Sequence, residues 1–348
     1  MAKISQDKVL IVGPSWVGDM VMSQALYKAL KETNPLTNIS VLARSTLRPL
    51  LERMPEVDEI LNSDFAHGEL RLSERKQFGM DLQDGNFNRA FILPLSFKSA
   101  LIPWHAKIPN RIGWRGEWRN ILLTDCRKLD KKAYPLMVQR FIGLAYPEST
   151  PPPDDLFFPK LLPKEPNEEF KYFRTNLSSK KNVLAICPGA EFGKSKQWPA
   201  AYFADVATRV LRKGWGVWIF GSSNDRSVAD LILGDIEEDF RDSCIDLVGK
   251  TDLSEAIDLL SLVSVVLSND SGLMHVAAAL GKNVIGLYGS TSPDFTPPLS
   301  NSKKLISTDI ECRPCFQREC RFGHLRCLTE IKPERVLDAI TSFGQDVN

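Results

Sequence analysis

The chain has 348 residues, of which 43% are hydrophobic and 25% are charged, and its formal net charge at pH 7 is +1. This length predicts two domains of ordinary size, and the near-neutral charge excludes nucleic acid as a partner held by a general positive field. No apolar run reaches the roughly 18 residues of a membrane span, and residues 1–7 lack the apolar core of a signal peptide. We therefore expect a cytoplasmic protein.

The first half of the chain alternates strand and helix patterns. Strands separated by helices predict a parallel sheet that is covered by helices on both faces. The elements expected here are a strand at 8–13, a helix at 20–30, a strand at 38–43, a helix at 48–54 and a strand at 91–95.

Repeated prolines between 147 and 166 predict a linker, because proline is excluded from helix interiors and central strands. A second alternating series follows, and Gly214 lies where a helix needs a left-handed end. We expect an α/β fold of two doubly wound, Rossmann-like domains, 1–165 and 166–348, whose last helix packs back on the first domain. The elements expected in the second series are strands at 182–187, 216–221, 263–268 and 283–289 and helices at 200–212, 226–234, 271–280 and 333–340.

The loop at 13–19 follows the first strand and opens a helix, where free main-chain N–H groups attract anions. It contains only Gly13 and Gly18, so it is not the glycine-rich dinucleotide fingerprint. Asp19 is available either as a helix cap or as a catalytic base.

Residues 268–275 end an apolar strand and begin an alanine-rich helix. The main-chain amides near Ser271 and Gly272 are expected to receive a diphosphate, with Asp270 capping the helix or holding a ligand hydroxyl. An ordinary helix start is the alternative. His275 lies in the first turn and either belongs to this site or simply packs.

Three further polar groups follow strands of the second half. Lys194 and Lys196 could reach phosphate oxygens, although surface lysines are mostly solvated. Asp225 stands where acidic side chains often bind ribose hydroxyls, and helix capping is again the alternative.

Seven cysteines in a chain without an export signal argue against a disulfide framework. Four of them cluster, and only the first gap between them is typical of zinc sites. A structural zinc, free or partly disulfide-linked thiols and, less favoured, an iron–sulfur cluster are the alternatives. The clustered residues are Cys312, Cys315, Cys320 and Cys327.

Three segments resemble the ADP-heptose:lipopolysaccharide heptosyltransferases, glycosyltransferase family 9, and among them the enzymes that add the second heptose. The segments are GPSWVGDM at 13–20, PGAEFG at 188–193 and NDSGLMHVAAAL at 269–280. The resemblance extends to RMPEV at 53–57, SFKSAL at 96–101, RIGWRGE at 111–117, YPLMV at 134–138 and SPDFTPPLS at 292–300.

The resemblance implies a GT-B fold with two domains facing a central cleft and inverting transfer of L-glycero-D-manno-heptose from ADP-heptose, without a catalytic cofactor. Asp19 matches the family's general base and Lys196 the lysine that neutralises the leaving diphosphate. The donor-binding residues implied by the same match are Asp225, Gly249, Thr251, Asp270, Ser271, Gly272 and His275.

The implied acceptor is the first heptose of the lipopolysaccharide inner core, which carries phosphates and carboxylates. Four cations of the first domain are candidates to bind it, and solvated surface charge is the alternative. They are Lys98, Arg111, Arg115 and Arg119.

A lipid-linked acceptor implies peripheral contact with the inner face of the inner membrane. A transferase for another core position, such as the first heptose, and a nucleotide-sugar-binding protein without turnover are the alternative functions. Because a binding protein has no need of both Asp19 and Lys196, the pair favours an enzyme.

Overall fold

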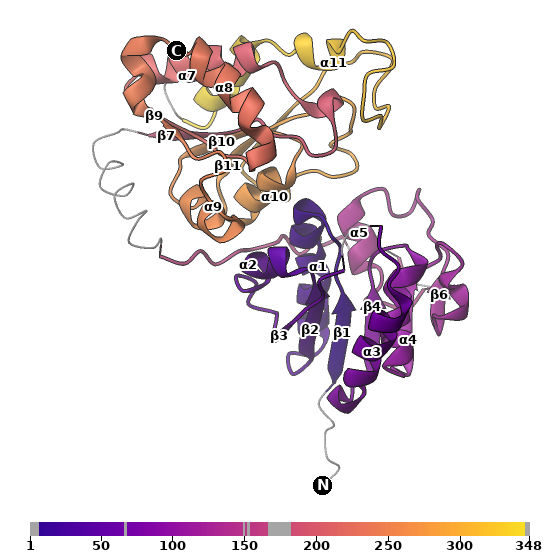
Figure 1. Cartoon of the computed structure of the whole chain (residues 1–348). Coiled ribbons are helices and arrows are strands. Elements are labelled where there is room, and N and C mark those ends of the chain that lie inside the picture. The colour runs from indigo at the N-terminus through magenta and orange to yellow at the C-terminus, as the bar shows by residue number, and fades with distance from the viewer. Residues whose placement is uncertain (1–6, 66–67, 149, 152–153, 166–181, 345–348) are drawn as a thin grey trace. The chain divides into compact units, whose positions relative to one another are not determined.

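The computed structural model describes residues 7–65, 68–148, 150–151, 154–165 and 182–344. The chain divides into two compact units, Met1–Leu161 and Leu162–Asn348 (Figure 1). None of the helices in these described ranges combines the length and the apolar composition that a membrane span needs.

The first unit contains a six-stranded sheet in the order β3-β2-β1-β4-β5-β6, and every pair of neighbouring strands is parallel. In the register, Ile11 of β1 lies between Val41 of β2 and Phe91 of β4. The strand order reverses beside β1, so a crevice is expected outside its carboxyl end. The strands are β1 (Lys8–Val12), β2 (Asn38–Ala43), β3 (Glu59–Asn62), β4 (Arg89–Ile92), β5 (Asn110–Trp114) and β6 (Asp125–Arg127).

Helices cover both faces of this sheet. Leu10 and Val12 of β1 belong to one apolar cluster with α4, while Val9 and Ile11 alternate to the opposite face. Gly79 of α3 is packed so closely against α4 that an added Cβ would lie 2.7 Å from the Ile102 carbonyl oxygen. The helices are α1 (Val17–Thr33), α2 (Arg48–Leu51), α3 (Leu72–Asp81), α4 (Leu101–His105) and α5 (Met137–Ile142), with short 3-10 turns η1 (Ser45–Leu47), η2 (Gln83–Gly85), η3 (Phe97–Ala100) and η4 (Arg119–Ile121).

The second unit repeats this plan with a parallel sheet in the order β12-β11-β10-β7-β8-β9, which reverses beside β7. Its strands are β7 (Val183–Cys187), β8 (Gly216–Ile219), β9 (Cys244–Asp246), β10 (Val265–Asn269), β11 (Asn283–Leu287) and β12 (Lys303–Ile306). Its helices are α7 (Ala200–Arg212), α8 (Arg226–Asp235), α9 (Leu253–Leu260), α10 (Gly272–Ala279), α11 (Arg326–Thr329) and α12 (Pro333–Thr341), with η5 (Lys194–Lys196), η6 (Ser223–Asp225) and η7 (Glu238–Ser243).

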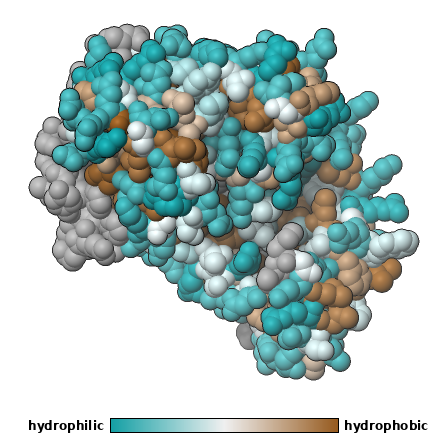
Figure 2. Space-filling view, turned by 45° about the horizontal axis from the view of Figure 1, so that its top comes forward, coloured by the Kyte–Doolittle hydropathy of each residue, from teal (hydrophilic) through white to brown (hydrophobic). Residues whose placement is uncertain are grey.

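The core of the second unit lies where α7 packs on α8 and α12. Trp198 and Trp215 are among its largest fully buried side chains. Gly214 ends α7 with a φ of +78°, as its position in the sequence predicts. The last helix, α12, buries Val336 and Ile340 in this same core. Hydrophilic residues cover most of the face drawn in Figure 2, with separate hydrophobic patches between them.

Candidate functional site

The first unit has a cleft of about 750 Å³ at the carboxyl ends of β1, β2 and β4. The loop after β1 forms one wall. Gly13 is closely packed there, since a Cβ would lie 2.7 Å from Met20 Cε and 3.3 Å from the Leu42 carbonyl oxygen. The helix α1 starts from this loop, so its first turn lines the cleft.

Asp19 lies in that first turn, half-buried, and lines the cleft. Trp16 holds the N-cap position of α1, and its side chain makes no capping hydrogen bond. Asp19 is therefore not the N-cap residue itself but the acidic residue of the first helical turn. A carboxylate at the wall of a cleft is suitably placed to accept a proton from a bound hydroxyl.

Four cationic side chains also line this cleft, and they differ in their partners. Arg75 donates to the main-chain oxygen of Leu70 at 2.7 Å, and Arg140 donates to that of Tyr134 at 3.0 Å. The half-buried side chains of Lys98 and Arg44 have no hydrogen-bond or ion-pair partner among the residues that the structure describes. These two cations are therefore available to an anionic ligand.

Sequence reasoning selected Lys98 and missed Arg44. Arg44 directly follows the last residue of β2, Ala43. This is the carboxyl edge of the sheet, where ligands of such folds bind. A cation directly after a buried strand is thus the signal that could have identified it.

The structure contradicts the predicted acceptor contact of Arg119. Its side chain is fully buried, and the guanidinium donates to the main-chain oxygens of Trp114, at 3.0 Å from Nε, and of Pro94. Burial lowers the pKa of Arg119 to about 10. Its donors hold carbonyl groups of the surrounding loops, so none is directed to a ligand.

Arg111 and Arg115 do not line the cleft either. The Arg111 guanidinium donates to the main-chain oxygens of Leu122, at 2.6 Å, and of Ile108, so it joins β5 to the loops beside it. The structure gives this arginine a structural role in place of the predicted acceptor contact. Arg115 is exposed outside the cleft.

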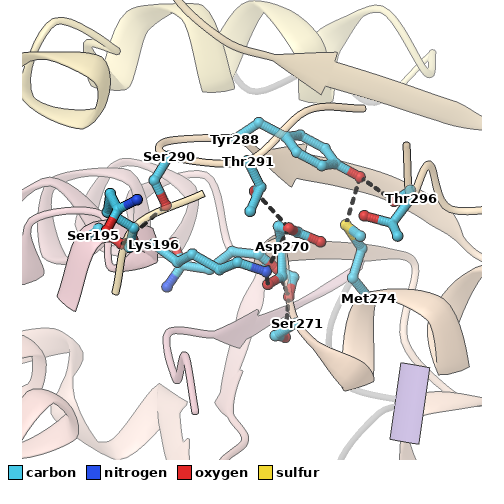
Figure 3. Close-up of polar contacts among 12 residues, drawn as sticks. Ser195, Lys196, Asp270, Ser271, Met274, Tyr288, Ser290, Thr291 and Thr296 are labelled. Carbon is cyan, nitrogen blue, oxygen red and sulfur yellow. Dashed lines mark hydrogen bonds and ion pairs between the residues drawn. The ribbon is translucent and has the colours of Figure 1, made fainter. Parts of the chain in front are cut away.

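In the second unit, Lys196, Asp270 and Thr291 meet at the carboxyl edge of the sheet (Figure 3). Lys196 Nζ lies 2.6 Å from Asp270 Oδ2, and its side chain is 14% exposed, against 4% for Asp270. Thr291 Oγ1 donates to the same carboxylate oxygen at 2.6 Å. A buried ion pair with a further hydrogen bond holds both charges in fixed positions.

The amino end of α10 adjoins this ion pair. Lys196 Nζ also donates to the main-chain oxygen of Asp270 at 3.2 Å, and the N-cap Ser271 and the first helical residue, Gly272, come next in the chain. The ammonium group and the N–H groups at the start of α10 thus lie together. Both attract an anion, as expected for a diphosphate site.

His275 and Tyr288 are buried near this ion pair. Burial lowers the pKa of His275 to about 4; the negative charge of Asp270 partly opposes this shift, and the positive charge of Lys196 adds to it. The imidazole is therefore neutral near pH 7, and its side chain is 5% exposed. This geometry gives no support to the predicted direct donor contact of His275.

The segment that carries the clustered cysteines is hydrogen-bonded to the loops that form the site. Arg313 donates to the main-chain oxygens of Gly289 at 3.1 Å and Thr291 at 3.0 Å. Ser195, next to Lys196, shares a hydrogen bond of 2.9 Å with Ser290, and its N–H donates to the Arg318 carbonyl at 3.2 Å. The loop with Lys196 and the loop with Thr291 are thus both attached to this segment.

The four clustered cysteines themselves are free thiols. Burial and the neighbouring cysteines raise the pKa of Cys327. Among the residues that the structure describes, no group of three or more His, Cys, Asp or Glu side chains is arranged to hold a metal ion. The arrangement of Cys312, Cys315, Cys320 and Cys327 therefore gives no support to the expected zinc.

The other predicted donor residues lie at neighbouring strand ends. Asp225 accepts from the Ser222 N–H at 2.8 Å and from its hydroxyl at 2.9 Å, so its carboxylate caps the turn η6. Gly249 has a φ of +70° and donates to the Gly221 carbonyl at 3.0 Å. Thr251 donates to the Leu247 carbonyl at 3.4 Å. Asp225 thus takes the capping role that was the alternative from sequence.

A family model described as glycosyltransferase family 9 (heptosyltransferase) matches residues 75–326. Lipopolysaccharide heptosyltransferase 2 of Escherichia coli K12 is 42% identical over 341 residues, which cover 97% of this chain and 98% of that protein. Lipooligosaccharide heptosyltransferase 2 of Haemophilus ducreyi is 43% identical over 347 residues, which cover 97% of this chain and 99% of that protein.

Solved structures agree with these sequence matches. The structure of E. coli ADP-heptose lipopolysaccharide heptosyltransferase II matches with a TM-score of 0.84 at 41% identity, over 96% of this chain and 98% of that one. An E. coli heptosyltransferase solved with ADP matches with a TM-score of 0.70 over 96% of this chain and 99% of that one, and at 17% identity it shows the fold alone. The two parallel six-stranded sheets, together with the match to E. coli heptosyltransferase II, confirm the predicted GT-B fold.

Proposed function

The chain belongs to glycosyltransferase family 9, the heptosyltransferases, and we propose that it transfers a heptose from ADP-heptose to the first heptose of the lipopolysaccharide inner core. The observation that carries this proposal is the buried Lys196–Asp270 pair beside the start of α10. The pair holds the Lys196 ammonium group in place near the N–H groups at the start of α10, where both can donate hydrogen bonds to a leaving diphosphate, in a family that transfers heptose. The relatives named heptosyltransferase 2 support the choice of acceptor.

The donor's diphosphate is assigned to the second unit. Negative charge grows on the phosphate oxygens as the bond to the sugar breaks, and fixed positive groups stabilise that charge. Lys196 and the first N–H groups of α10 are such groups, and Asp270 with Thr291 fixes the position of the lysine. Asp270 also remains our candidate for a contact with the donor sugar.

The acceptor is assigned to the cleft of the first unit. Its phosphates and carboxylates match Arg44 and Lys98, the two cations of that cleft that have no partner within the described part of the chain. Asp19 on the wall of the cleft is the proposed base. The acceptor hydroxyl attacks the anomeric carbon of the donor, the bond from that carbon to the phosphate oxygen breaks, and the hydroxyl proton passes to Asp19, which leaves ADP and an inverted glycosidic bond.

The test is release of ADP from ADP-heptose by the purified protein, with acceptors that carry zero, one or two core heptoses. The proposal predicts release that depends on the one-heptose acceptor. A preference for the heptose-free acceptor would make the chain a transferase for the first heptose. Binding of ADP-heptose without release for any acceptor would instead support a nucleotide-sugar-binding protein.

The acceptor is part of a lipid, so the proposed reaction takes place where the inner face of the inner membrane meets the cytoplasm. The protein must therefore approach that surface while the sugars of the acceptor occupy the cleft. We propose peripheral contact with this surface, since the reacting groups are sugars outside the bilayer.

A further inference from the structure

Two side chains near the cleft of the first unit are unusually exposed for their type. Trp118 is 87% exposed and Ile121 is 73% exposed, the two highest values among the large hydrophobic residues that the structure describes. Trp118 also has a φ of +53°, a left-handed conformation that is unfavourable for a bulky residue. The fold thus holds a large apolar side chain in water on a strained backbone.

The segment around Trp118 is firmly attached to the unit. The buried guanidinium of Arg119 donates to the Trp114 and Pro94 carbonyls, and Glu117 Oε2 accepts from the Phe97 N–H at 3.1 Å. These bonds anchor the backbone on both sides of Trp118, so little main-chain freedom is lost when the segment docks against a partner.

The same segment borders the cleft. Glu117 lines the cleft, and so does Leu95, which is 48% exposed. Gly116 lies so close to Leu95 that an added Cβ would come within 2.4 Å of the Leu95 carbonyl oxygen. Leu129, after β6, lines the cleft as well. We call residues 115–121 and 128–132, which flank these contacts, the rim surface.

The rim surface also carries exposed positive charge. Arg115 follows β5, and its N–H donates to the Arg127 carbonyl at 2.7 Å, which places it beside the end of β6. The carboxylates of the rim surface, Glu117 and Asp130, both accept main-chain N–H groups. The exposed cations of the rim surface are Arg115, Lys128, Lys131 and Lys132.

We propose that the rim surface is a membrane-docking surface, on which Trp118 and Ile121 enter the interface of a bilayer that contains anionic lipid while the surrounding cations bind its headgroups. This inference rests on the proposed function, because a lipid-linked acceptor in the cleft brings its rim to the membrane. Tryptophan favours the membrane–water interface, and clustered lysine and arginine side chains favour anionic lipid.

The first experiment is cosedimentation of the full-length protein with vesicles of phosphatidylethanolamine and phosphatidylglycerol, and with vesicles of phosphatidylcholine. We expect binding to the anionic vesicles that weakens with salt, and at least tenfold weaker binding for Trp118→Ala/Ile121→Ala. Leu36→Ala is the matched control. Leu36 is 68% exposed but precedes β2, so it lies at the opposite edge of the sheet from Trp118, which follows β5.

Trp118→Gly separates docking from folding. Glycine adopts a positive φ without strain, so this variant should fold at least as stably as the unchanged protein and still lose vesicle binding. Vesicle binding by Trp118→Ala/Ile121→Ala equal to that of the Leu36→Ala control would overturn the proposal. So would a change of oligomeric state in these variants without loss of vesicle binding, since the rim surface would then meet a second copy of the chain.

Activity with two acceptors distinguishes this inference from the proposed function. With the acceptor embedded in vesicles, Trp118→Ala/Ile121→Ala should lose at least tenfold in kcat/KM, and with a deacylated, soluble acceptor it should match the unchanged protein. Equal losses with both acceptors would assign the rim surface to sugar binding and reject membrane docking. If the unchanged protein has no activity with either acceptor, the proposed function fails, while the vesicle measurements still decide the docking surface.

Discussion

The two units share one architecture but differ in the burial and pairing of the charged side chains at the carboxyl edges of their sheets. In the second unit, Lys196 and Asp270 are buried and bonded to each other. In the first unit, Arg44 and Lys98 face a cleft without a partner among the described residues. The second unit therefore has a preorganised charge arrangement, whereas the first has cations that a ligand must neutralise.

This difference fits the chemistry of the two proposed substrates. A leaving diphosphate gains charge during the reaction, and fixed groups stabilise that charge without reorganising. An acceptor only has to bind and present its hydroxyl, for which cations that line the cleft suffice. Variants of the two regions should accordingly fail in different ways.

The largest effect is expected at Asp19. Without the base, Asp19→Ala should lower kcat on the order of a thousandfold, while binding of ADP-heptose stays unchanged. Steady-state rates of ADP release and calorimetry of donor binding measure the two quantities. Glu32→Ala, an exposed carboxylate near the other end of α1, is the control and should retain full activity. Unchanged turnover in Asp19→Ala would reject this residue as the base.

Lys196→Met should impair both folding and catalysis, because it leaves the buried Asp270 carboxylate without its cation. We expect a loss of about 3–5 kcal/mol in the free energy of unfolding and a decrease in kcat on the order of a hundredfold. Urea unfolding and ADP release provide the measurements. Adding Asp270→Asn removes the uncompensated charge, so the double variant should recover most of the stability but none of the activity. Recovery of activity would contradict the role of Lys196 at the leaving group.

Burial of His275 makes the stability of the second unit depend on pH. Its folded pKa of about 4 lies below the ordinary 6.5, so below pH 6.5 the unfolded state binds the proton first and stability falls until about pH 4. Between pH 7 and 4.5 this contribution is about 2–3 kcal/mol. Urea unfolding at both pH values should show that His275→Gln loses that much less stability on acidification. An equal loss in both proteins would contradict a buried, neutral imidazole.

The smallest effects are expected in the open cleft. Arg44→Ala and Lys98→Ala should each raise KM for a phosphorylated acceptor about tenfold, which corresponds to about 1.4 kcal/mol of lost binding. The KM for ADP-heptose and the free energy of unfolding should not change. Lys76→Ala, an exposed lysine of α3, serves as the control. If only the KM for ADP-heptose changed, these cations would bind the donor, and their proposed role in acceptor binding would be rejected.

The sequence predicted the central strands of both sheets, because β1, β2, β4, β7, β8, β10 and β11 are short apolar runs. It did not identify β3, β6, β9 or β12, which are the edge strands of the two sheets. An edge strand is covered on fewer sides, so it keeps polar residues such as Glu59 and Asp125 and lacks the apolar run that marks a buried strand. Strand β5, interrupted by Gly113, was also missed.

For the site, the sequence placed Asp19 at the start of the helix after the first strand, Lys196 in a loop after a strand and Asp270 at the end of a strand, and the structure has them in α1, in η5 after β7 and directly after β10. It could not show that Asp270 bonds to Lys196, since 74 residues separate them and only the sheet brings them together. It also failed for Arg119, because burial of an arginine depends on carbonyl groups supplied by loops elsewhere in the chain. The role of Asp19 as base stays a prediction.

Calorimetry of ADP binding to the full-length protein most directly tests the proposal that the second unit binds the donor and the first unit binds the acceptor. We predict that Arg44→Ala/Lys98→Ala binds ADP as tightly as the unchanged protein. Lys196→Met/Asp270→Asn, folded but without the buried cation, should bind it at least tenfold more weakly. Weaker ADP binding in the first variant, or unchanged binding in the second, would contradict the assignment of the donor to the second unit.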